Sequence, residues 1–265
     1  MDGTRAPLDV DRLTAQVVAP GSTWTQVEAL ASVPSTNDHA AQRAREGAPH
    51  GLVVTTEDQT AGRGRLDRGF VTRPGANLVV SVVLRPDVPL RRWVWLPLLT
   101  GLAVRDTVVA AGVEPTLKWP NDVLVGGRKI CGILLERVET PAGGAAVLGI
   151  GLNVSLREDE LPVPTATSLV IEGARTTDRT ELLVDLLGHL DGWLGRWSAA
   201  EDPTPELARA YRSACSTVGQ QVRVELPDGT ALTGRADDVD SDGRLVVDGR
   251  PLSAGDVTHV RPHRP

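Results

Sequence analysis

The stretch from Leu117 to Glu139 reads "LKWPNDVLVGGRKICGILLERVE". Gly126 and Gly127 separate two β-rich runs, and a glycine pair in that position is typical of a hairpin turn. Charged and amide side chains stand on both arms, in "KWPND" before the turn and at Lys129 after it. The stretch therefore predicts a β-hairpin, and with it a sheet that carries polar groups.

Further regular elements are predicted on both sides of this hairpin. Ser35-Thr36-Asn37 is a good helix start, because these side chains can cap free backbone N–H groups. Runs of apolar residues indicate strands at 24–33, 51–57, 77–86 and 145–155. Other helices are predicted at 9–18, 92–112, 179–197 and 205–215.

The character of the sequence changes after Thr217. Short alternating runs are separated there by Asp-Gly pairs at 228–229, 242–243 and 248–249, and each pair is typical of a tight turn. About 45 residues arranged as several short strands indicate a small barrel of SH3-like size. We therefore predict three parts, namely a short N-terminal extension at 1–22, a main domain at 23–216 and the barrel at 217–265.

Composition limits the classes of protein to which the chain can belong. Its 265 residues carry a formal net charge of −6, whereas a general nucleic-acid binder usually has an excess of basic residues. Residues 1–20 contain no apolar run of the signal-peptide kind, and we expect no segment to reach the length of a membrane span. A cytoplasmic protein with two free thiols, Cys131 and Cys215, is therefore predicted.

A glycine-rich loop with three arginines follows the strand at 51–57. It reads "EDQTAGRGRLDRGF", Glu57 to Phe70, and has neither a helical stripe nor strand alternation. Glycines let backbone N–H groups approach a ligand, and arginines make forked, charge-assisted hydrogen bonds that suit phosphate and carboxylate. The loop thus predicts a small-anion site. On the loop alone, a solvated flexible segment or an RG-type contact with nucleic acid is an equal alternative.

The polar groups of the hairpin each allow two interpretations. Asp122 is placed to hold Mg²⁺ on a triphosphate and Lys118 to contact a phosphate, whereas the alternative is an ordinary Pro-Asn-Asp turn. Lys129 is either the partner of an anion or an edge-strand lysine that aids solubility. Alternation puts Lys129 and Cys131 on one face, and Cys131 is predicted to be a packing residue rather than a nucleophile.

The order and spacing of the motifs are more specific than any single motif. "STN" is followed by "QTAGRGR", "KWPND", "RKICGIL" and "GIGLNV", and then by the small β-domain. Together, from Trp24 to Arg261, they resemble biotin protein ligase (biotin–[acetyl-CoA carboxylase] ligase). The resemblance implies an α+β fold, in which a mixed-sheet catalytic domain of the biotin/lipoate ligase type precedes a small SH3-like β barrel. It also implies the reaction: biotin and ATP form biotinyl-5′-adenylate, and biotin then passes to one lysine of a biotin carboxyl carrier domain.

The resemblance also assigns roles to individual residues. It implies Arg65, Lys129 and Lys118 as catalytic residues and Asp122 as a ligand of Mg²⁺. The residues implied for biotin binding are Ser35, Thr36, Asn37, Gln59, Arg63, Gly64, Arg65, Lys129 and Gly132. Those implied for ATP and the adenylate are Arg65, Arg68, Lys118, Asn121, Asp122 and Asn153. The arginine loop would close over biotin and the phosphate as a lid that excludes water.

The sequence departs from the family pattern in three places. Asp67 replaces the last glycine of the loop, which removes a hinge and adds a carboxylate near the arginines. The aromatic residue that usually follows the loop in the family is Phe70 in this sequence, which is a mild change. Met1 to Thr23 is too short for the DNA-binding domain that some members carry, so we predict a ligase without repressor function.

Two other functions stay open at this point. A lipoate–protein ligase or octanoyl transferase is similar in its catalytic core, although the whole set of motifs favours biotin. An RNA- or DNA-binding module would use the arginine loop and the C-terminal barrel. The net charge of −6 and the lack of stacking aromatic residues on the barrel count against it.

Overall fold

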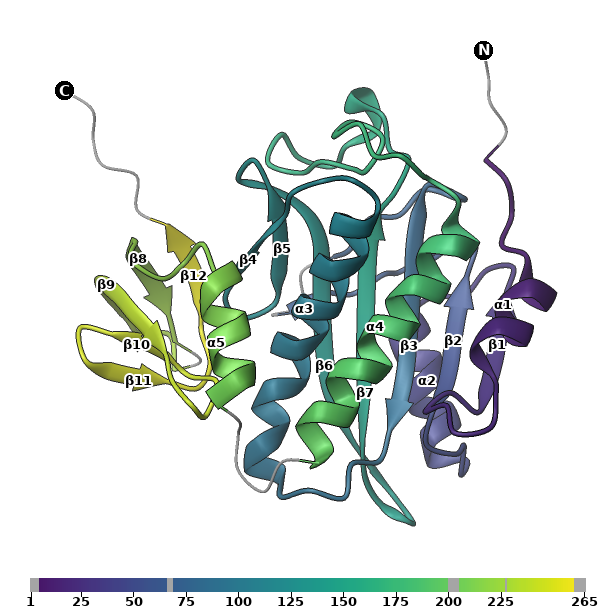
Figure 1. The fold of residues 1–265 in the computed structure, drawn as a ribbon, viewed down its shortest axis with the longest axis horizontal. Coiled ribbons are helices and arrows are strands. Elements are labelled where there is room, and N and C mark those ends of the chain that lie inside the picture. The colour runs from purple at the N-terminus through teal and green to yellow at the C-terminus, as the bar shows by residue number, and fades with distance from the viewer. Residues whose placement is uncertain (1–4, 66–68, 200–204, 227, 260–265) are drawn as a thin grey trace.

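The computed structural model describes residues 5–65, 69–199, 205–226 and 228–259, and its main feature is one seven-stranded sheet (Figure 1). The strands lie in the order β1-β2-β3-β7-β6-β5-β4. β1 and β2 run parallel and the other neighbours run antiparallel, so the sheet is mixed, as predicted. The strands are β1 (Gln26–Leu30), β2 (Leu52–Thr56), β3 (Asn77–Leu84), β4 (Thr116–Lys118), β5 (Asp122–Val125), β6 (Arg128–Thr140) and β7 (Gly143–Asn153).

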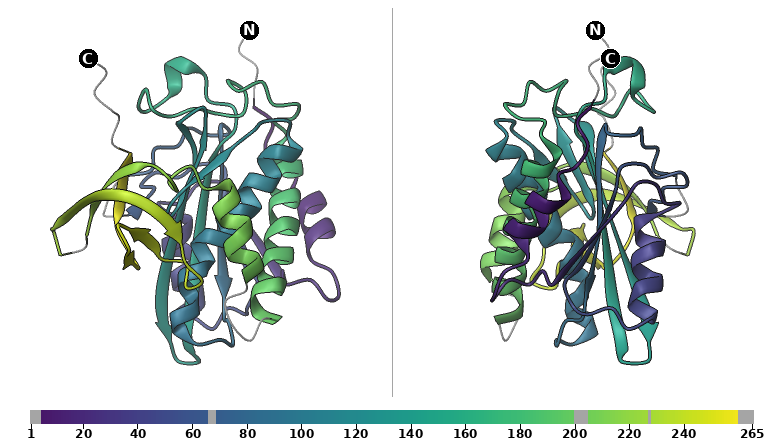
Figure 2. Two further views of the ribbon diagram at one scale, coloured as in Figure 1. Left: turned by 60° about the vertical axis from the view of Figure 1, so that its left-hand side comes forward. Right: turned by 90° about the vertical axis from the view of Figure 1, so that its right-hand side faces the viewer.

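Helices cover the two faces of this sheet unequally (Figure 2). α1 (Val10–Val17), α3 (Trp95–Ala110) and α4 (Arg179–Ala199) form a layer on one face, over the larger core. α2 (Thr36–Arg45) packs on the other face, against β2, β3, β6 and β7. Because α2 is short, part of that face is covered by loops instead, and the pocket described below lies there.

The start of α2 is fixed by the residue predicted to cap it. Ser35 has an extended backbone, and its Oγ accepts a hydrogen bond from the N–H of Asp38 at 3.3 Å. The sheet-facing side of the helix carries Ala40, Ala41 and Ala44, all buried. These small side chains let the helix lie close to the strands, so its first turn comes within reach of polar groups on them.

The apolar helix predicted at 92–112 is α3, which follows a 3₁₀ turn (Leu90–Val94). Pro97 lies in its first turn, where a missing backbone N–H costs no intrahelical hydrogen bond. Leu90 to Ala110 is long and apolar enough to cross a bilayer, so the expectation that no segment reaches that length is wrong. However, 67% of its 18-residue apolar window is buried inside the protein, which is the environment of a core helix.

The predicted hairpin is formed by β5 and β6, and it contains a β-bulge. Gly126 and Gly127 have φ values of 56° and 81°, as a two-residue turn between such strands requires. Val123 pairs with Cys131 but Leu124 pairs with Lys129, so one extra residue stands on β6. The extra residue changes the face of the sheet to which the side chains on either side of it point. The prediction that Lys129 and Cys131 share a face is therefore wrong, since Cys131 lies in the core and Lys129 lines the pocket.

The C-terminal part is an antiparallel five-stranded sheet in the order β11-β10-β9-β8-β12, the predicted SH3-like domain. Two indole N–H groups fasten it to the main domain. Trp119 Nε1 donates to the carbonyl oxygen of Gly243 at 3.0 Å, and Trp95 Nε1 donates to that of Ser241 at 3.1 Å. Its strands are β8 (Gln221–Glu225), β9 (Ala231–Val239), β10 (Leu245–Val247), β11 (Arg250–Leu252) and β12 (Asp256–His259), and α5 (Pro205–Ala214) precedes them.

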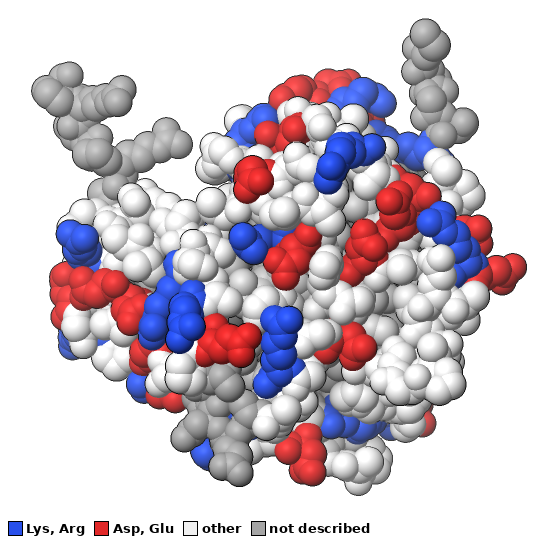
Figure 3. Space-filling view, in the orientation of Figure 1, with Lys and Arg blue, Asp and Glu red and all other residues white. Residues whose placement is uncertain are grey.

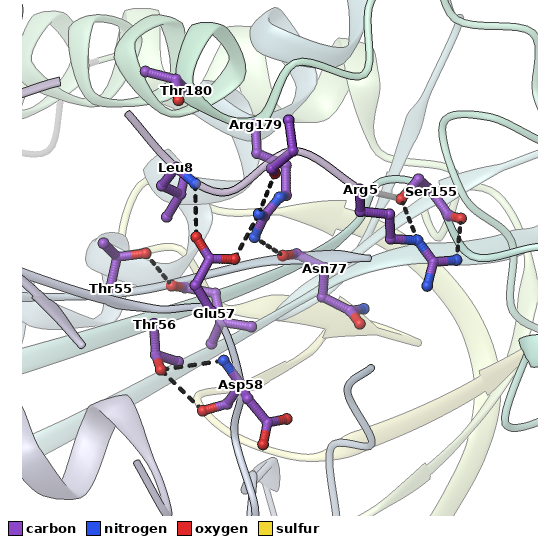
Figure 4. Close-up of polar contacts among 12 residues, drawn as sticks. Arg5, Leu8, Thr55, Thr56, Glu57, Asp58, Asn77, Ser155, Arg179 and Thr180 are labelled. Carbon is purple, nitrogen blue, oxygen red and sulfur yellow. Dashed lines mark hydrogen bonds and ion pairs between the residues drawn. The ribbon is translucent and has the colours of Figure 1, made fainter. Parts of the chain in front are cut away.

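The N-terminal segment is held by an ion pair at the base of the arginine loop (Figure 4). Arg179, whose side chain is 4% exposed, donates to Glu57 Oε2 at 2.6 Å and to the carbonyl oxygen of Ala6 at 2.8 Å. Glu57 Oε1 accepts the N–H of Leu8 at 2.6 Å. Glu57 follows β2 directly. The pair thus ties α4 and the described part of 1–22 to the start of the loop.

We expect Glu57→Gln to lower the free energy of unfolding by about 2–3 kcal/mol, because it removes the charged acceptor of a buried guanidinium. Arg179 keeps its bond to Ala6, which limits the loss. Urea unfolding measures the effect, with Glu139→Gln as the control, since Glu139 is exposed on β6. A loss below about 0.5 kcal/mol would show that the ion pair contributes no more than a surface contact.

Candidate active site

A pocket opens between the first turn of α2, the arginine loop and the strands β6 and β7. The space between its walls, open solvent at the mouth included, is about 470 Å³. The structure brings every residue predicted for biotin binding to its wall, together with Asn121 of the predicted ATP set. Apolar groups complete the wall, among them Val79, Ile150 and Phe70.

The buried end of the pocket is a network of amide and hydroxyl groups. Gln59 Oε1 accepts hydrogen bonds from the N–H and the hydroxyl of Thr36, at 2.9 and 3.0 Å. Ser81 Oγ lies 2.8 Å from Thr36 Oγ1 and 2.6 Å from Asn37 Oδ1. These four side chains are buried, so a ligand that reaches them must supply hydrogen-bonding groups or leave polar atoms unpaired.

Two glycines of β7 make room for this network. A side-chain carbon on Gly149 would lie 2.2 Å from Asn37 Oδ1, and one on Gly151 would lie 2.4 Å from the ring of Phe70. Only glycine therefore lets α2 and the ring of Phe70 approach the sheet this closely. These glycines belong to "GIGLNV". Sequence reasoning missed both, and it missed Ser81, although a hydroxyl inside the apolar run "LVVSVVL" was the available signal.

Arg63 is held between two carboxylates. Its Nη2 lies 2.5 Å from Asp38 Oδ1 on α2 and 3.0 Å from both oxygens of Glu136 on β6. The loop turns back at this point, where the N–H of Phe70 donates to the carbonyl oxygen of Gly62 at 2.8 Å. Arg63 thus fastens the loop to the sheet and to α2. Glu136 is a further site residue that sequence reasoning missed.

Arg65 stands where the two domains meet. Its Nη1 donates to Asn121 Oδ1 at 3.1 Å and to the carbonyl oxygen of Gly255 at 3.2 Å. Asn121 is itself oriented, because its Nδ2 donates to the carbonyl oxygen of Ile133 at 2.9 Å. The guanidinium at the mouth of the pocket is therefore positioned by both domains. Arg68, the third arginine predicted for the site, lies outside the described residues, as does Asp67.

The chain has only two lysines, and both lie beside Asp122. Lys129 Nζ is 2.6 Å from Asp122 Oδ1, and Lys118 Nζ is 3.8 Å from Asp122 Oδ2. Lys129 extends over Gly132, where an added side-chain carbon would lie 3.0 Å from Nζ. A lysine that has an acidic partner and lies at the wall of a pocket fits the anion-binding interpretation better than the solubility one.

The arrangement does not favour Asp122 as a metal ligand. Its two oxygens face the ammonium groups of Lys129 and Lys118. Within the described residues, no group of three or more His, Cys, Asp or Glu side chains is placed to hold a metal ion. A single carboxylate holds Mg²⁺ only together with other ligands such as substrate phosphates. Asp122 as a ligand of Mg²⁺ therefore stays a prediction.

Asn153 lies apart from the pocket wall. Its Nδ2 donates to the carbonyl oxygen of Thr167 at 2.8 Å, and its Oδ1 accepts from Asn77 Nδ2 at 2.9 Å. The side chain is buried, and both ends of its amide are engaged. Asn153 thus holds the irregular segment after β7 to β3, and its assignment to ATP stays a prediction.

The two cysteines take no part in the site. Both are free and buried, as the sequence predicts. Burial raises the pKa of the Cys131 thiol to about 12 and also raises the pKa of Cys215, so both thiols stay protonated at neutral pH. The interpretation of Cys131 as a packing residue is confirmed.

The wall of the pocket combines three kinds of group. It carries buried amide and hydroxyl groups, apolar side chains such as Val79 and Ile150, and the cations of Arg65 and Lys129. A ligand with a polar head, an aliphatic chain and an anionic end would find a partner for each of its parts. Oriented cations at such a mouth stabilise negative charge that develops on a carboxylate or a phosphate.

Two stretches of the chain match models of known protein families. Residues 29–153 match the Biotin/lipoate A/B protein ligase family, and residues 217–260 match the Biotin protein ligase C terminal domain. The chain is 43% identical to the biotin–[acetyl-CoA-carboxylase] ligase of Mycobacterium tuberculosis, over 98% of each chain. It is 33% identical to the bifunctional ligase/repressor BirA of Bacillus spizizenii, over 82% of this chain and 67% of that protein.

Solved structures share the fold. The biotin protein ligase from Aquifex aeolicus in complex with biotin and ATP matches with a TM-score of 0.75 at 25% identity, over 90% of this chain and 100% of that one. The biotin protein ligase from Leishmania major in complex with biotinyl-5-AMP matches with a TM-score of 0.59 at 24% identity, over 90% and 99% of the two chains. The fold expected from the sequence, a mixed-sheet domain with a C-terminal SH3-like domain, is confirmed.

Proposed function

The chain belongs to the biotin/lipoate A/B protein ligase family, and on that basis we propose that it is an ATP-dependent biotin ligase. First, the carboxylate of biotin attacks the α-phosphorus of ATP, so that biotinyl-5′-adenylate forms and pyrophosphate leaves. Then the ε-amine of a carrier lysine attacks the acyl carbon, an amide forms and AMP leaves. The composition of the pocket wall carries this proposal, because biotin has a ureido head, an aliphatic chain and a carboxylate, and the wall offers polar, apolar and cationic groups.

The polar end of the pocket supports biotin over its closest rivals. We assign the ureido head to Ser35, Thr36, Asn37 and Gln59, with Gly132 leaving room for the rings. The dithiolane of lipoate and the alkyl end of octanoate offer no comparable hydrogen bonds. A site built to hydrogen-bond its substrate rejects an analogue without those groups by about 10⁴–10⁵-fold. A lipoate–protein ligase or octanoyl transferase is therefore the weaker reading.

The cations at the mouth suit the first step. Biotin and ATP are both anions, and bringing them together requires positive charge held in place. We assign this role to Arg65 and Lys129, and further contacts with ATP to Lys118, Asn121 and Asp122. The loop residues Arg63 and Gly64 would close over the carboxylate end of biotin. Arg68 is predicted to lie near the phosphates of ATP. Mg²⁺ would enter with ATP, as part of the substrate.

The distribution of charge supports an enzyme rather than a nucleic-acid-binding module. On the face shown in Figure 3, which is the side that α3 and α4 cover, acidic and basic side chains are interleaved. Arg63 is already paired with the two carboxylates of Asp38 and Glu136. A module that binds the phosphate backbone would instead present its arginines as a positive surface.

The partner and the compartment follow from the second step. The relative from Mycobacterium tuberculosis is named for acetyl-CoA carboxylase. The proposed acceptor is accordingly a lysine in the biotin carboxyl carrier domain of an acyl-CoA carboxylase. The proposed compartment is the cytoplasm, where ATP and the carrier are both available. Within the chain, we propose 23–216 as the catalytic domain and 217–265 as the C-terminal domain.

Exchange of labelled pyrophosphate into ATP tests the proposed function. We expect exchange that depends on biotin and needs no carrier protein, because the adenylate forms before transfer. Lipoate and octanoate in place of biotin are the matched controls. Exchange that responds to either of these acids, but not to biotin, would contradict the assignment.

A further inference from the structure

We propose that Glu136 is a positioning residue of this ligase, one that sets the orientation of both Asn37 and Arg63. The inference rests on the proposed function and deepens it. Glu136 lies on β6, where Gly132 and Leu134 line the pocket at alternate positions. Its side chain therefore leaves the sheet on the pocket side, behind the residues that meet the ligand.

The first contact fixes an amide. Asn37 Nδ2 donates to Glu136 Oε2 at 2.7 Å, and Asn37 Oδ1 accepts from the hydroxyl of Ser81 at 2.6 Å. A hydroxyl can donate or accept, so Ser81 alone would tolerate either orientation of the amide. An ionised carboxylate only accepts. Glu136 therefore fixes the orientation of the Asn37 amide, with Nδ2 toward Glu136 and Oδ1 toward Ser81. This orientation sets which hydrogen-bonding groups Asn37 offers to the head of the substrate.

The second contact fixes the loop. Both oxygens of Glu136 lie 3.0 Å from Arg63 Nη2, and Asp38 Oδ1 approaches the same nitrogen. An isolated β-bridge joins Arg63 to Gly69, on the returning side of the loop. Phe70 follows at once, and its ring packs where Gly151 leaves space. Anchoring Arg63 to β6 thus also places the aromatic wall of the pocket.

Glu136→Gln keeps the shape of the side chain and removes its charge. Both oxygens of Glu136 lie 3.0 Å from Arg63 Nη2, so in either orientation of the new amide its N–H₂ group faces that nitrogen, donor against donor, and the contact with Arg63 is weakened. We expect the Kd and the KM for biotin to rise about 10- to 100-fold, the range for losing a charge-assisted hydrogen bond. The kcat of pyrophosphate exchange should change much less, because Glu136 does not touch the reacting atoms.

The control is Glu139→Gln on the same strand, whose carboxylate pairs with Arg137 at the surface. It should leave the KM for biotin within about twofold of the wild type. Arg63→Ala completes a double-mutant cycle with E136Q. If Glu136 acts through Arg63, the two substitutions together should raise the KM by clearly less than the product of their separate effects.

Calorimetric titration gives the Kd for biotin and pyrophosphate exchange gives its KM, and both are to be measured, with thermal melts, on the wild type, both glutamine variants, Arg63→Ala and the double variant. An unchanged KM in E136Q would overturn the positioning role, and fully multiplicative effects in the cycle would overturn its part through Arg63. A lowered melting temperature with wild-type kinetics would assign Glu136 to stability alone. If E136Q does not fold, Glu136→Asp serves instead, since its shorter carboxylate should also weaken biotin binding. A wild-type protein that binds no biotin would refute the proposed function itself.

Discussion

Lys129→Ala is expected to lower kcat/KM for biotin-dependent pyrophosphate exchange by about 10³-fold, the upper range for losing a preorganised donor to developing charge. Lys129 Nζ is held 2.6 Å from Asp122 at the pocket wall, so its charge is in place before the reaction begins. The side chain is 41% exposed and adds little to the core, so the free energy of unfolding should stay within about 0.5 kcal/mol.

The controls separate charge from position. Lys129→Arg keeps the charge but replaces a compact ammonium with a planar fork, so it should recover only part of the rate. Arg137→Ala removes an exposed cation from the same strand and should leave the rate within about twofold. Full activity of the alanine variant would show that Lys129 takes no part in the reaction.

The chain offers a second, direct readout. Because Lys118 and Lys129 are its only lysines, mild acetylation followed by mass spectrometry reports on each ε-amine separately. Biotin and ATP together should protect Lys129 from the reagent. Equal labelling with and without the substrates would show that the ligand does not reach this side chain, whatever the kinetic result.

The fold was predictable where its signals are local. Gly126 and Gly127 predict the hairpin, Ser35 predicts the start of α2, and Asp-Gly pairs predict the turns of the C-terminal domain. The residues predicted for biotin also meet in one pocket, because their motifs stand at strand ends and on one loop beside the same sheet. Hydrophobic alternation and turn chemistry suffice for the hairpin, the helix start and the turns, whereas the set of biotin residues came from the resemblance to the ligase family.

The rest depends on contacts that no local pattern contains. The bulge adds one residue to β6, and a shift of one residue moves a side chain to the other face of a sheet, which is why alternation misplaced Lys129 relative to Cys131. Glu136 is 99 residues from Asn37 and 73 from Arg63 along the chain. Only the folded sheet brings these three together, so a glutamate in "GILLERVE" gives no sign of its partners.

Asn153 is the instructive opposite case. It belongs to a motif of the family pattern, and yet its buried amide is engaged by Asn77 and Thr167. A motif predicts which residue types stand at a position, but burial and hydrogen-bond partners decide whether the side chain can reach a ligand. For Asn153 the partners indicate a part in holding the segment after β7.

Arg65→Ala is expected to slow formation of the adenylate by about 10²–10³-fold, because it removes an oriented donor from the place where the carboxylate and the α-phosphate must meet. Asn121 and Gly255 hold the guanidinium from two domains. Little reorganisation is then needed when charge develops, and such preorganised donors give the largest electrostatic effects. Rapid quench of biotinyl-adenylate in a single turnover measures the step itself.

Two explanations of a slow variant must be told apart, namely a lost donor and a loosened C-terminal domain. Arg65→Lys keeps a charge at the mouth but cannot reproduce a fork that bonds to Asn121 and to the Gly255 carbonyl. If the donor matters, the lysine variant should fall between alanine and wild type. If only the domain contact matters, both variants should lower the melting temperature and behave alike in rate. Arg223→Ala is the matched control. Arg223 is an exposed arginine of β8 that lines the same surface hollow as Arg65 and Gly255, and its replacement should leave the rate within about twofold.

An unchanged single-turnover rate in Arg65→Ala would refute the role assigned to this arginine. The positive charge at the mouth would then rest on Lys129, with Lys118 beside it.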